Sequence, residues 1–430
     1  MILGTPYTAR MRLYDRAEAE RLDREDPLAP LRDRFVIDDP QLIYLDGNSL
    51  GRLPRQSLER LRVVVEQEWG RRLIRSWNER WMDLPARVGD LIGQRLLGAA
   101  PGQVVVADST SVNLYKLAVA ALDARPGRTV IVSDRNNFPS DRYVLEGLAA
   151  ARGLRLELVD FDELRGPTAA AVAPLIDERT ALVSLSHVDY RSGALADMAG
   201  INALAHDAGA LTLWDLCHSV GSVPVELDAG GADLAVGCTY KYLNAGPGAP
   251  ALLYVRAEHV ERLRQPIWGW FGQRDQFAMG QGYAPAPDIS RFLVGTPQVL
   301  GVALVEEGAR LLAEAGIQRL RAKGMALTGL LVALHDAWLA PLGLTLASPR
   351  DAAARGSHVA IAHPDAYRIC RALVDKAGVI PDFRAPDRIR LGLAPITTRF
   401  TDVWDAMDRL RAIVAEGVHL TVDPTRARVT

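Results

Sequence analysis

Two residues capable of covalent and acid–base chemistry follow two apolar runs in the middle of the chain. Asp215 closes the run LTLWD, and Lys241 comes 26 residues later, just after the apolar run 234–237. Taken singly, such an aspartate is usually a cap and such a lysine is usually solvated. As a pair they match what pyridoxal phosphate requires, a lysine to form a Schiff base and an acid to keep the pyridine nitrogen protonated. The sequence therefore predicts a pyridoxal phosphate site.

Other polar residues stand in the loops where such a site should lie. In an open α/β sheet the ligand binds beyond the carboxyl ends of the strands. Thr110 and Ser111 open a helical pattern, where free amides and the helix dipole favour a phosphate group, although the same residues could act only as helix caps. Phe138, in a further loop, offers an aromatic ring to cover the cofactor. These loops predict a phosphate site and a ring site at one edge of the sheet.

Short β-branched runs alternate with longer helical patterns through the middle of the chain, which is typical of βαβ units and a mostly parallel sheet. The expected strands are 104–107, 128–133, 154–159, 181–186, 211–215, 234–237 and 251–255. The helical patterns between them, with apolar residues at steps of three and four, are 112–122, 142–151 and 199–208. These elements predict one large, doubly wound α/β domain with a seven-stranded, mostly parallel sheet.

The last third of the chain has a different pattern. A long amphipathic stretch over 298–337 predicts one long helix, after which the short strands 358–362 and 388–393 alternate with the helices 364–377 and 401–415. This alternation predicts a smaller α+β domain. We expect three regions: an N-terminal segment 1–60 that packs on the other two, a large cofactor-binding domain 61–300 and a small C-terminal domain 301–430.

Composition restricts the class of protein further. The chain has 430 residues, 49% hydrophobic and 24% charged, which is typical of an ordinary globular protein. A formal net charge of −2 gives no reason to expect nucleic acid or a membrane surface as partner, so a small-molecule substrate is expected. Three cysteines without a Cys-x-x-Cys pair predict neither a disulfide framework nor a metal site. With no signal-peptide pattern at the N-terminus and no apolar run of membrane-spanning length, we expect a cytoplasmic protein.

Two alternatives to a hydrolytic pyridoxal phosphate enzyme have distinct requirements. A cysteine desulfurase or selenocysteine lyase of the same fold needs a nucleophilic cysteine on a mobile loop, whereas Cys370 lies inside a helical pattern. A regulator that only senses the cofactor needs a DNA-binding module, for which the short N-terminal segment has no room. Dinucleotide, Walker A, nucleophile-elbow and paired-histidine motifs are not found, and the glycine-rich run 246–251 contains prolines and precedes a strand.

Several strings together resemble the kynureninase family, fold-type I pyridoxal phosphate enzymes that hydrolyse L-kynurenine to anthranilate and L-alanine in tryptophan catabolism and NAD biosynthesis. The strings are LDGNSLG at 45–51, FPSD at 138–141, DLCH at 215–218, TYKYLNAG at 239–246 and GWFG at 269–272. The resemblance covers nearly the whole chain. It implies the fold-type I architecture, a large domain of the aspartate aminotransferase kind with a smaller α+β domain.

The resemblance also implies roles for individual residues. Lys241 corresponds to the Schiff-base lysine, Asp215 to the partner of the pyridine nitrogen, and Tyr240 is the candidate acid and base. Further cofactor contacts are implied for Thr110, Ser111, Phe138, Pro139, Ser140, Asp141, Ser186, His218 and Tyr240. Trp270 and Thr296 resemble residues that a second subunit contributes, so the family pattern implies a homodimer with shared sites.

Substrate-binding residues follow from the same resemblance. Arg390 stands where the family binds the substrate α-carboxylate, although from the residues alone it would be an edge-strand arginine facing solvent. The other implied substrate contacts are Asn48, Trp77, Gly295 and Thr296. Family members that prefer 3-hydroxykynurenine carry His, Ser and Asn where this chain has Trp77, Gly295 and Thr296. The pattern therefore resembles the bacterial, kynurenine-preferring branch.

Overall fold

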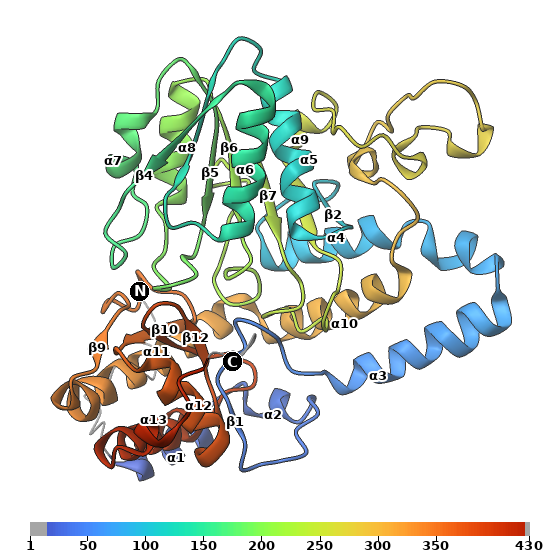
Figure 1. Cartoon of the computed structure of the whole chain (residues 1–430). Coiled ribbons are helices and arrows are strands. Elements are labelled where there is room, and N and C mark those ends of the chain that lie inside the picture. Colours follow the sequence, from blue (N-terminus) through green and yellow to red (C-terminus); the bar gives the residue numbers. More distant parts are fainter. Residues whose placement is uncertain (1–14, 426–430) are drawn as a thin grey trace, which may run out of the picture.

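The larger part of the molecule is built on a seven-stranded sheet, shown in Figure 1. The computed structural model of the chain describes residues 15–425. The strands lie in the order β2 (Val104–Val106), β8 (Leu252–Val255), β7 (Leu234–Gly237), β6 (Leu211–Asp215), β5 (Thr180–Ser186), β3 (Val130–Asp134) and β4 (Arg155–Val159). Strand β8 runs antiparallel to both β2 and β7, and the remaining neighbours are parallel. The predicted seven-stranded, mostly parallel sheet is confirmed.

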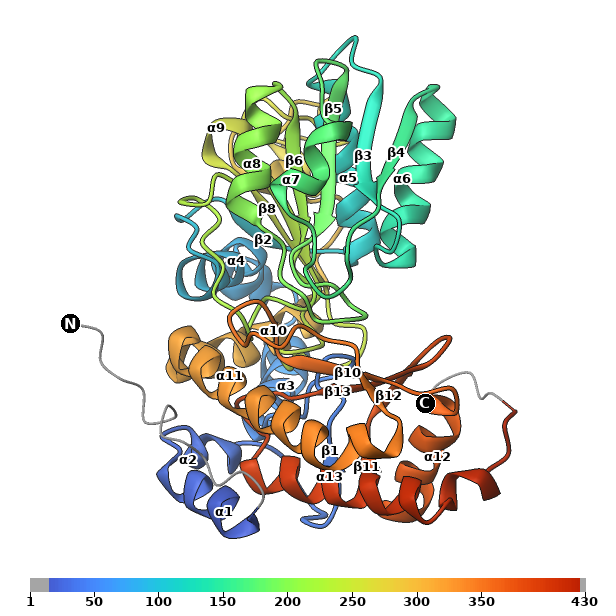
Figure 2. The ribbon, with the colours of Figure 1, turned by 90° about the vertical axis from the view of Figure 1, so that its left-hand side faces the viewer.

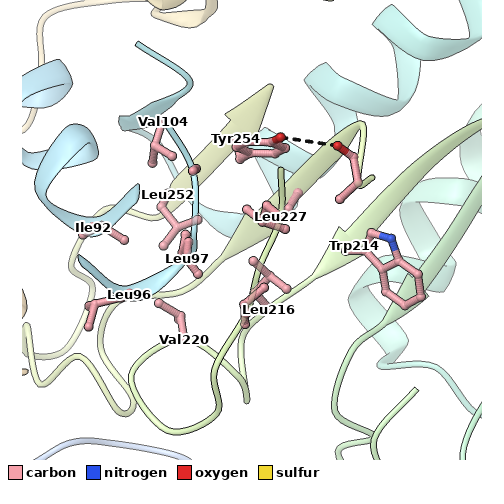
Figure 3. Packing of buried hydrophobic residues seen from close by; sticks show 14 of the residues in the cluster. Ile92, Leu96, Leu97, Val104, Trp214, Leu216, Val220, Leu227, Leu252 and Tyr254 are labelled. Atoms are coloured by element: carbon pink, nitrogen blue, oxygen red, sulfur yellow. Dashed lines mark hydrogen bonds between the residues drawn. The ribbon is translucent and has the colours of Figure 1, made fainter. Parts of the chain in front are cut away.

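Both faces of this sheet are covered by helices, because alternate residues of each strand point to opposite sides. Val104, Val106 and Trp214 pack toward α4 (Leu84–Leu96) and α8 (Met198–Asp207), as Figure 3 shows in part. Val105 and Leu213 pack toward α5 (Thr110–Asp123) and α6 (Pro139–Arg152) on the other face. Figure 2 shows the two helical layers on either side of the strands. The buried sheet is therefore a rigid base for the loops at its carboxyl edge.

A second, smaller layer of structure lies below the carboxyl edge of the large sheet (Figure 2). Its antiparallel sheet has the order β12 (Asp382–Arg384), β13 (Arg388–Gly392), β10 (His358–Ala362) and β9 (Thr345–Leu346). The helices that cover it are α11 (Ile317–Leu334), α12 (Ala366–Ala377) and α13 (Phe400–Ala415). This arrangement is the smaller α+β domain that the sequence predicts.

The described part of the N-terminal segment packs on both larger parts. Helix α1 (Arg16–Glu25) contacts α13, and β1 (Ile43–Tyr44) pairs in parallel with β11 (Val379–Ile380). After the short helix α2 (Ala29–Arg32), Phe35 joins the core of the large domain. Domain boundaries at residues 60 and 300 stay predictions.

The prediction of a single long helix over 298–337 is wrong. The structure has two helices, α10 (Val299–Ala315) and α11, separated by Gly316 with φ +81°. Glycine adopts this left-handed conformation without a steric penalty, so the helical bonds end there. The break lets α10 pack on the large domain while α11 packs in the core of the small one. Apolar periodicity continues across the glycine because both helices bury one face.

One helical stretch, 317–342, is long and apolar enough to cross a membrane by length and composition alone. From the sequence, no apolar run of this length was expected. Its side chains Leu327, Leu331 and Leu334 are fully buried against the small sheet and its helices. These residues make the stretch part of the core of the small domain. Core helices can be as long and as apolar as a membrane-spanning helix.

Helix α10 lies unusually close to the loop that follows Lys241. A Cβ atom on Gly308 would lie 1.9 Å from the carbonyl oxygen of Leu243, whereas one on Gly329 in α11 would meet nothing within 4 Å. We expect Gly308→Ala to lower the free energy of unfolding by about 1–3 kcal/mol through overpacking. Gly329→Ala should raise it by about 0.5–1 kcal/mol, because alanine is the better helix former. Urea unfolding of the two variants measures the difference, and equal stabilities would contradict the close approach.

Candidate active site

Twelve residues from the carboxyl edge of the large sheet line one pocket of about 90 Å³. They follow β2, β3, β5, β6 and β7, as expected for a ligand site in an open α/β sheet. The lining residues are Thr110, Ser111, Phe138, Ser140, Asp141, Ser186, Tyr190, Asp215, Cys217, His218, Tyr240 and Lys241. The chain therefore brings the loops singled out in the sequence to a single cavity.

Lys241 reaches the pocket from a turn that follows β7. The turn is fixed by hydrogen bonds from the Ala245 amide to the Thr239 carbonyl (3.1 Å) and from the Thr239 hydroxyl to the Pro250 carbonyl (2.7 Å). The Lys241 Nζ lies 3.3 Å from His218 Nε2 and 5.8 Å from the centre of the Phe138 ring. Within residues 15–425 this amine forms no ion pair with a carboxylate, so it is available for a covalent bond.

Two buried carboxyl groups lie together at the floor of the pocket. Asp215 ends β6 and accepts a hydrogen bond from the Cys217 amide at 2.7 Å. Burial, and then the neighbouring negative charge of Asp215, raise the pKa of Asp141 well above its usual range. Asp141 therefore holds a proton more firmly than a free aspartate does. A protonated pyridine nitrogen suits this site, because it would pair with a carboxylate of these two residues.

Two further groups beside Lys241 have fixed protonation states. Burial, followed by the positive charges of Lys241 and Arg390, lowers the pKa of His218 well below its usual range, so the imidazole is neutral. Burial, followed by the nearby Cys238 and Cys217 thiols, raises the pKa of Tyr240 above its usual range, so the phenol keeps its proton. The site thus combines a free amine with a neutral base and a protonated hydroxyl.

Two helices begin at the rim of the pocket, with Thr110 and Ser111 at the start of α5 and Ser140 at the start of α6. Ser109 caps α5, since its hydroxyl accepts from the Val112 amide at 3.4 Å. Thr110 and Ser111 are therefore not the cap, and both line the pocket. Helix α6 begins at Pro139, so Ser140 lies in its first turn. Amides and hydroxyls at two helix starts suit a phosphate group.

Arg390 is buried and does not face solvent as an edge-strand arginine would. It is 1% exposed on β13, a central strand of the small sheet. It donates to Asp382, to the Ser49 hydroxyl (3.1 Å) and to the Tyr190 carbonyl (2.7 Å). In the amide orientation that satisfies both groups, Asn48 accepts from Arg390 Nε at 2.7 Å. Arg390 therefore reaches the pocket through Tyr190, which is one of its lining residues.

Seven of the predicted site residues do not line this pocket within one chain: Asn48, Trp77, Pro139, Trp270, Gly295, Thr296 and Arg390. Trp77 and Trp270 both pack on Phe271, with ring centres 5.8 and 4.8 Å apart, and the Phe271 amide donates to the Val294 carbonyl. Gly295 and Thr296 follow directly and are exposed. These residues therefore form a separate group on the surface of the same chain. Pro139 starts α6 without lining the cavity.

The pocket also contains two residues that the predicted site lacked. Tyr190 follows β5 by four residues, and its ring lies 5.3 Å from that of Phe138. Cys217 stands inside the DLCH string, and its sulfur lies 3.9 Å from the Thr110 hydroxyl. The rule that ligands bind beyond strand ends could have found both. No group of three or more His, Cys, Asp or Glu side chains that could hold a metal ion is present in residues 15–425.

The lysine amine, which has no carboxylate partner among residues 15–425, the buried carboxyl pair and the two helix starts fit pyridoxal phosphate. This fold and site define a fold-type I enzyme dependent on that cofactor. Solved structures support the fold: an apo cysteine desulfurase from Thermococcus onnurineus NA1 has a TM-score of 0.72 at 20% identity and covers 96% of this chain and 99% of its own. The cysteine desulfurase CsdA from Escherichia coli has a TM-score of 0.75 at 18% identity, covering 92% and 99%.

Sequence comparison gives the family. Residues 320–410 match the model of the kynureninase C-terminal domain, and residues 97–237 match that of the DegT/DnrJ/EryC1/StrS aminotransferase family. A kynureninase from Pseudomonas fluorescens is 46% identical over 400 residues, covering 91% of this chain and 94% of the relative. A kynureninase from Burkholderia pseudomallei is 45% identical over 423 residues, covering 96% and 99%. The chain belongs to the kynureninase family, and its activity is the hydrolysis of kynurenine.

Lys241 can be tested directly as the site of covalent attachment. We expect Lys241→Ala, dialysed after incubation with pyridoxal phosphate, to lack the visible absorption of a cofactor bound covalently to a lysine. Lys376→Ala is the control, because Lys376 is exposed on α12 and donates only to the Thr421 hydroxyl. A full visible band in the Lys241 variant would disprove the assignment.

Proposed function

We propose that this chain cleaves the Cβ–Cγ bond of L-kynurenine with water, releasing anthranilate and L-alanine, and that the pocket around Lys241 is where it does so. The observation that carries the proposal is the Lys241 amine, unpaired by any carboxylate, in a pocket with the buried Asp141–Asp215 pair. The reaction belongs to tryptophan catabolism. We also propose a cytoplasmic enzyme, in keeping with its three free, buried cysteines.

The residues of the pocket divide between the two ends of the cofactor. Thr110, Ser111 and Ser140, at the starts of α5 and α6, would hold the phosphate. Asp215, beside Asp141, would hold the pyridine nitrogen, and Phe138 would contact the ring. The remaining implied contacts are Pro139, Ser186, His218 and Tyr240. When bound, pyridoxal phosphate supplies an electron sink for negative charge at the carbons next to the substrate amine.

Each proton transfer has a group suited to it. Once the substrate amine has replaced Lys241, the freed lysine amine takes the proton from the substrate Cα and can return it later. Neutral His218, 3.3 Å from that amine, accepts a hydrogen bond from it and keeps it oriented. Tyr240, protonated at neutral pH, assists the addition of water to the γ-carbonyl and then protonates Cβ as anthranilate leaves.

Substrate orientation depends on the small domain. Arg390 binds the α-carboxylate through its planar guanidinium, which makes two parallel hydrogen bonds to a carboxylate. Asn48 accepts a hydrogen bond from the Nε of this guanidinium, and the Tyr190 carbonyl accepts one from a terminal nitrogen. The aryl ring then points toward a region that this chain alone leaves open.

We propose that a second copy of the chain completes that region, giving a homodimer with shared sites. Large apolar side chains are exposed in two segments, with Ile74 at 76%, Trp268 at 62% and Phe277 at 63%. Figure 1 shows the two segments projecting from the same side of the molecule. An exposed surface rich in aromatic residues is typical of a protein interface. Trp270 and Thr296 lie beside it and would enter the partner's pocket.

The shared site predicts complementation between two inactive variants. Lys241→Ala removes a residue of the chain's own pocket, whereas Trp270→Ala removes one given to the partner. A dimer of one variant with the other keeps one intact site, so subunits mixed after dissociation should recover about one quarter of the wild-type activity. Activity no greater than the mean of the separate variants would rule out a shared site.

Tyr240→Phe tests the acid–base role. We expect kcat to fall by roughly 10²- to 10⁴-fold, while exchange of the substrate Cα hydrogen in D₂O persists, because Lys241 is intact. Tyr242→Phe is a matched control: Tyr242 is buried next to Lys241, and its hydroxyl has no hydrogen-bond partner among the described residues. Anthranilate fluorescence reports turnover, and wild-type turnover in the Tyr240 variant would exclude the role.

Substrate preference follows from the residues around the aryl ring. Trp77, Gly295 and Thr296 offer nothing long and polar to meet a 3-hydroxyl group. A buried hydroxyl without a partner costs about 1–3 kcal/mol, or roughly ten- to more than a hundredfold in kcat/KM. We therefore expect L-kynurenine to be preferred over 3-hydroxy-L-kynurenine. A bridging water would reduce the difference.

The test compares kcat/KM for both substrates in the wild type and in the triple variant Trp77→His, Gly295→Ser, Thr296→Asn. The triple variant should move the ratio toward the hydroxylated substrate. Trp69→His, a change of the same type at an exposed tryptophan nearby in sequence, should leave the ratio unchanged. An equal or better rate with the hydroxylated substrate in the wild type would contradict this account of the pocket.

A further inference from the structure

Lys116 is a fully buried lysine that has no part in the chemistry described above. It lies on α5, six residues after Thr110, and is 0% exposed. Its ammonium donates to Asp108 Oδ2 at 2.7 Å and to the Phe292 carbonyl at 2.8 Å. Burial lowers the pKa of Lys116, and the Asp108 carboxylate opposes that change. Removing one partner of such a pair is costly, because it leaves a charge without a partner in the protein interior.

The first of these bonds fixes the turn that leads into the phosphate end of the pocket. Asp108 stands between β2 and α5, two residues before Thr110, and has φ +51°, which is uncommon for a residue other than glycine. A second side chain of α5 supports the same turn, since Asn113 donates to the Ala107 carbonyl at 2.8 Å. Two side chains of α5 therefore form hydrogen bonds to the turn that precedes the helix. This turn leads directly to Thr110 and Ser111 at the pocket.

The second bond reaches the segment assigned above to the partner's pocket. Phe292 is fully buried, and three residues after it the chain emerges at Gly295 and Thr296. The Lys116 ammonium thus links two regions. One is the start of α5, which lies at the pocket of the same chain, and the other is the base of the Gly295–Thr296 segment, which is proposed to enter the pocket of the partner.

We propose that Lys116 is a positioning residue, which holds the phosphate-binding start of α5 through Asp108 and anchors the Gly295–Thr296 segment through Phe292. The proposal rests on the proposed function, because it takes the start of α5 as the phosphate site. It goes beyond that function by assigning a role to a buried lysine and its partly buried carboxylate partner, which the proposed reaction does not use.

Comparison of two ligands separates positioning from general stability. Pyridoxal phosphate and pyridoxal differ only in the phosphate group. The dissociation constant of pyridoxal divided by that of pyridoxal phosphate, both from fluorescence quenching, therefore reports on the phosphate site. Lys116→Met should lower the preference for the phosphorylated form by about tenfold, the size expected for one charged hydrogen bond. Lys323→Met is the matched control. It breaks another buried pair, Lys323 with Asp26 at 2.6 Å, between α11 and the N-terminal segment.

A second pair of variants acts at Asp108 and leaves Lys116 in place. Glycine and asparagine both tolerate the φ angle found there, but only asparagine keeps an oxygen that can accept from Lys116. Asp108→Gly should therefore lose as much preference as Lys116→Met, and Asp108→Asn should lose less. This comparison holds even where Lys116→Met fails to fold.

Four outcomes decide the matter. A lower ratio in Lys116→Met and Asp108→Gly, with Lys323→Met at the wild-type ratio, supports the proposal. Wild-type ratios in the first two variants overturn it, and so does an equal loss in Lys323→Met, which would indicate general destabilisation. A wild-type protein that binds pyridoxal as tightly as its phosphate would instead refute the proposed cofactor site.

Discussion

The active site depends on keeping an amine and a carboxylate of opposite charge in one buried pocket without letting them pair. Asp215 accepts a hydrogen bond from the Cys217 amide and lies beside Asp141, while Lys241 lies next to the neutral imidazole of His218. If Lys241 and Asp215 formed an ion pair, neither would be free for the cofactor. The rigid carboxyl edge of the sheet provides the separation, because β6 and β7 are held in register and each ends in a fixed loop.

The same constraint explains why other parts of the chain pack closely against the turn that carries Lys241. The Gly51 amide donates to the Tyr240 carbonyl at 2.8 Å, and a Cβ atom on Gly51 would lie 2.3 Å from the Lys241 carbonyl. Gly308 of α10 approaches the turn from another direction. The LDGNSLG string also carries Asn48, the partner of Arg390. One short N-terminal segment therefore connects the Lys241 turn in the large domain to Arg390 in the small one.

Predictions from the sequence are correct where the feature depends on a single strand or a single helix. Strands 211–215 and 234–237 occur with the predicted bounds, and the residues that follow them meet in one pocket. Periodicity failed at Gly316, because two helices with one apolar face each look like a single helix. Arg390 and Lys116 could not be placed as buried from local pattern, because partners distant in sequence satisfy them. Residues proposed to complete a neighbouring subunit's site have no signal in the spacing of one chain.

The shared fold with cysteine desulfurases raises the question of why sulfur chemistry is not expected here. Cys370 is fully buried in α12, and burial raises its pKa well above the usual range, so its thiol is neither accessible nor ionised. Cys217 does line the pocket, but contact with Cys238 and burial raise its pKa as well. A thiol without thiolate character is a poor nucleophile. The group that remains beside Lys241 is the protonated hydroxyl of Tyr240, and a proton donor is what a carbon leaving group requires. The same cofactor site is thereby suited to carbon–carbon cleavage.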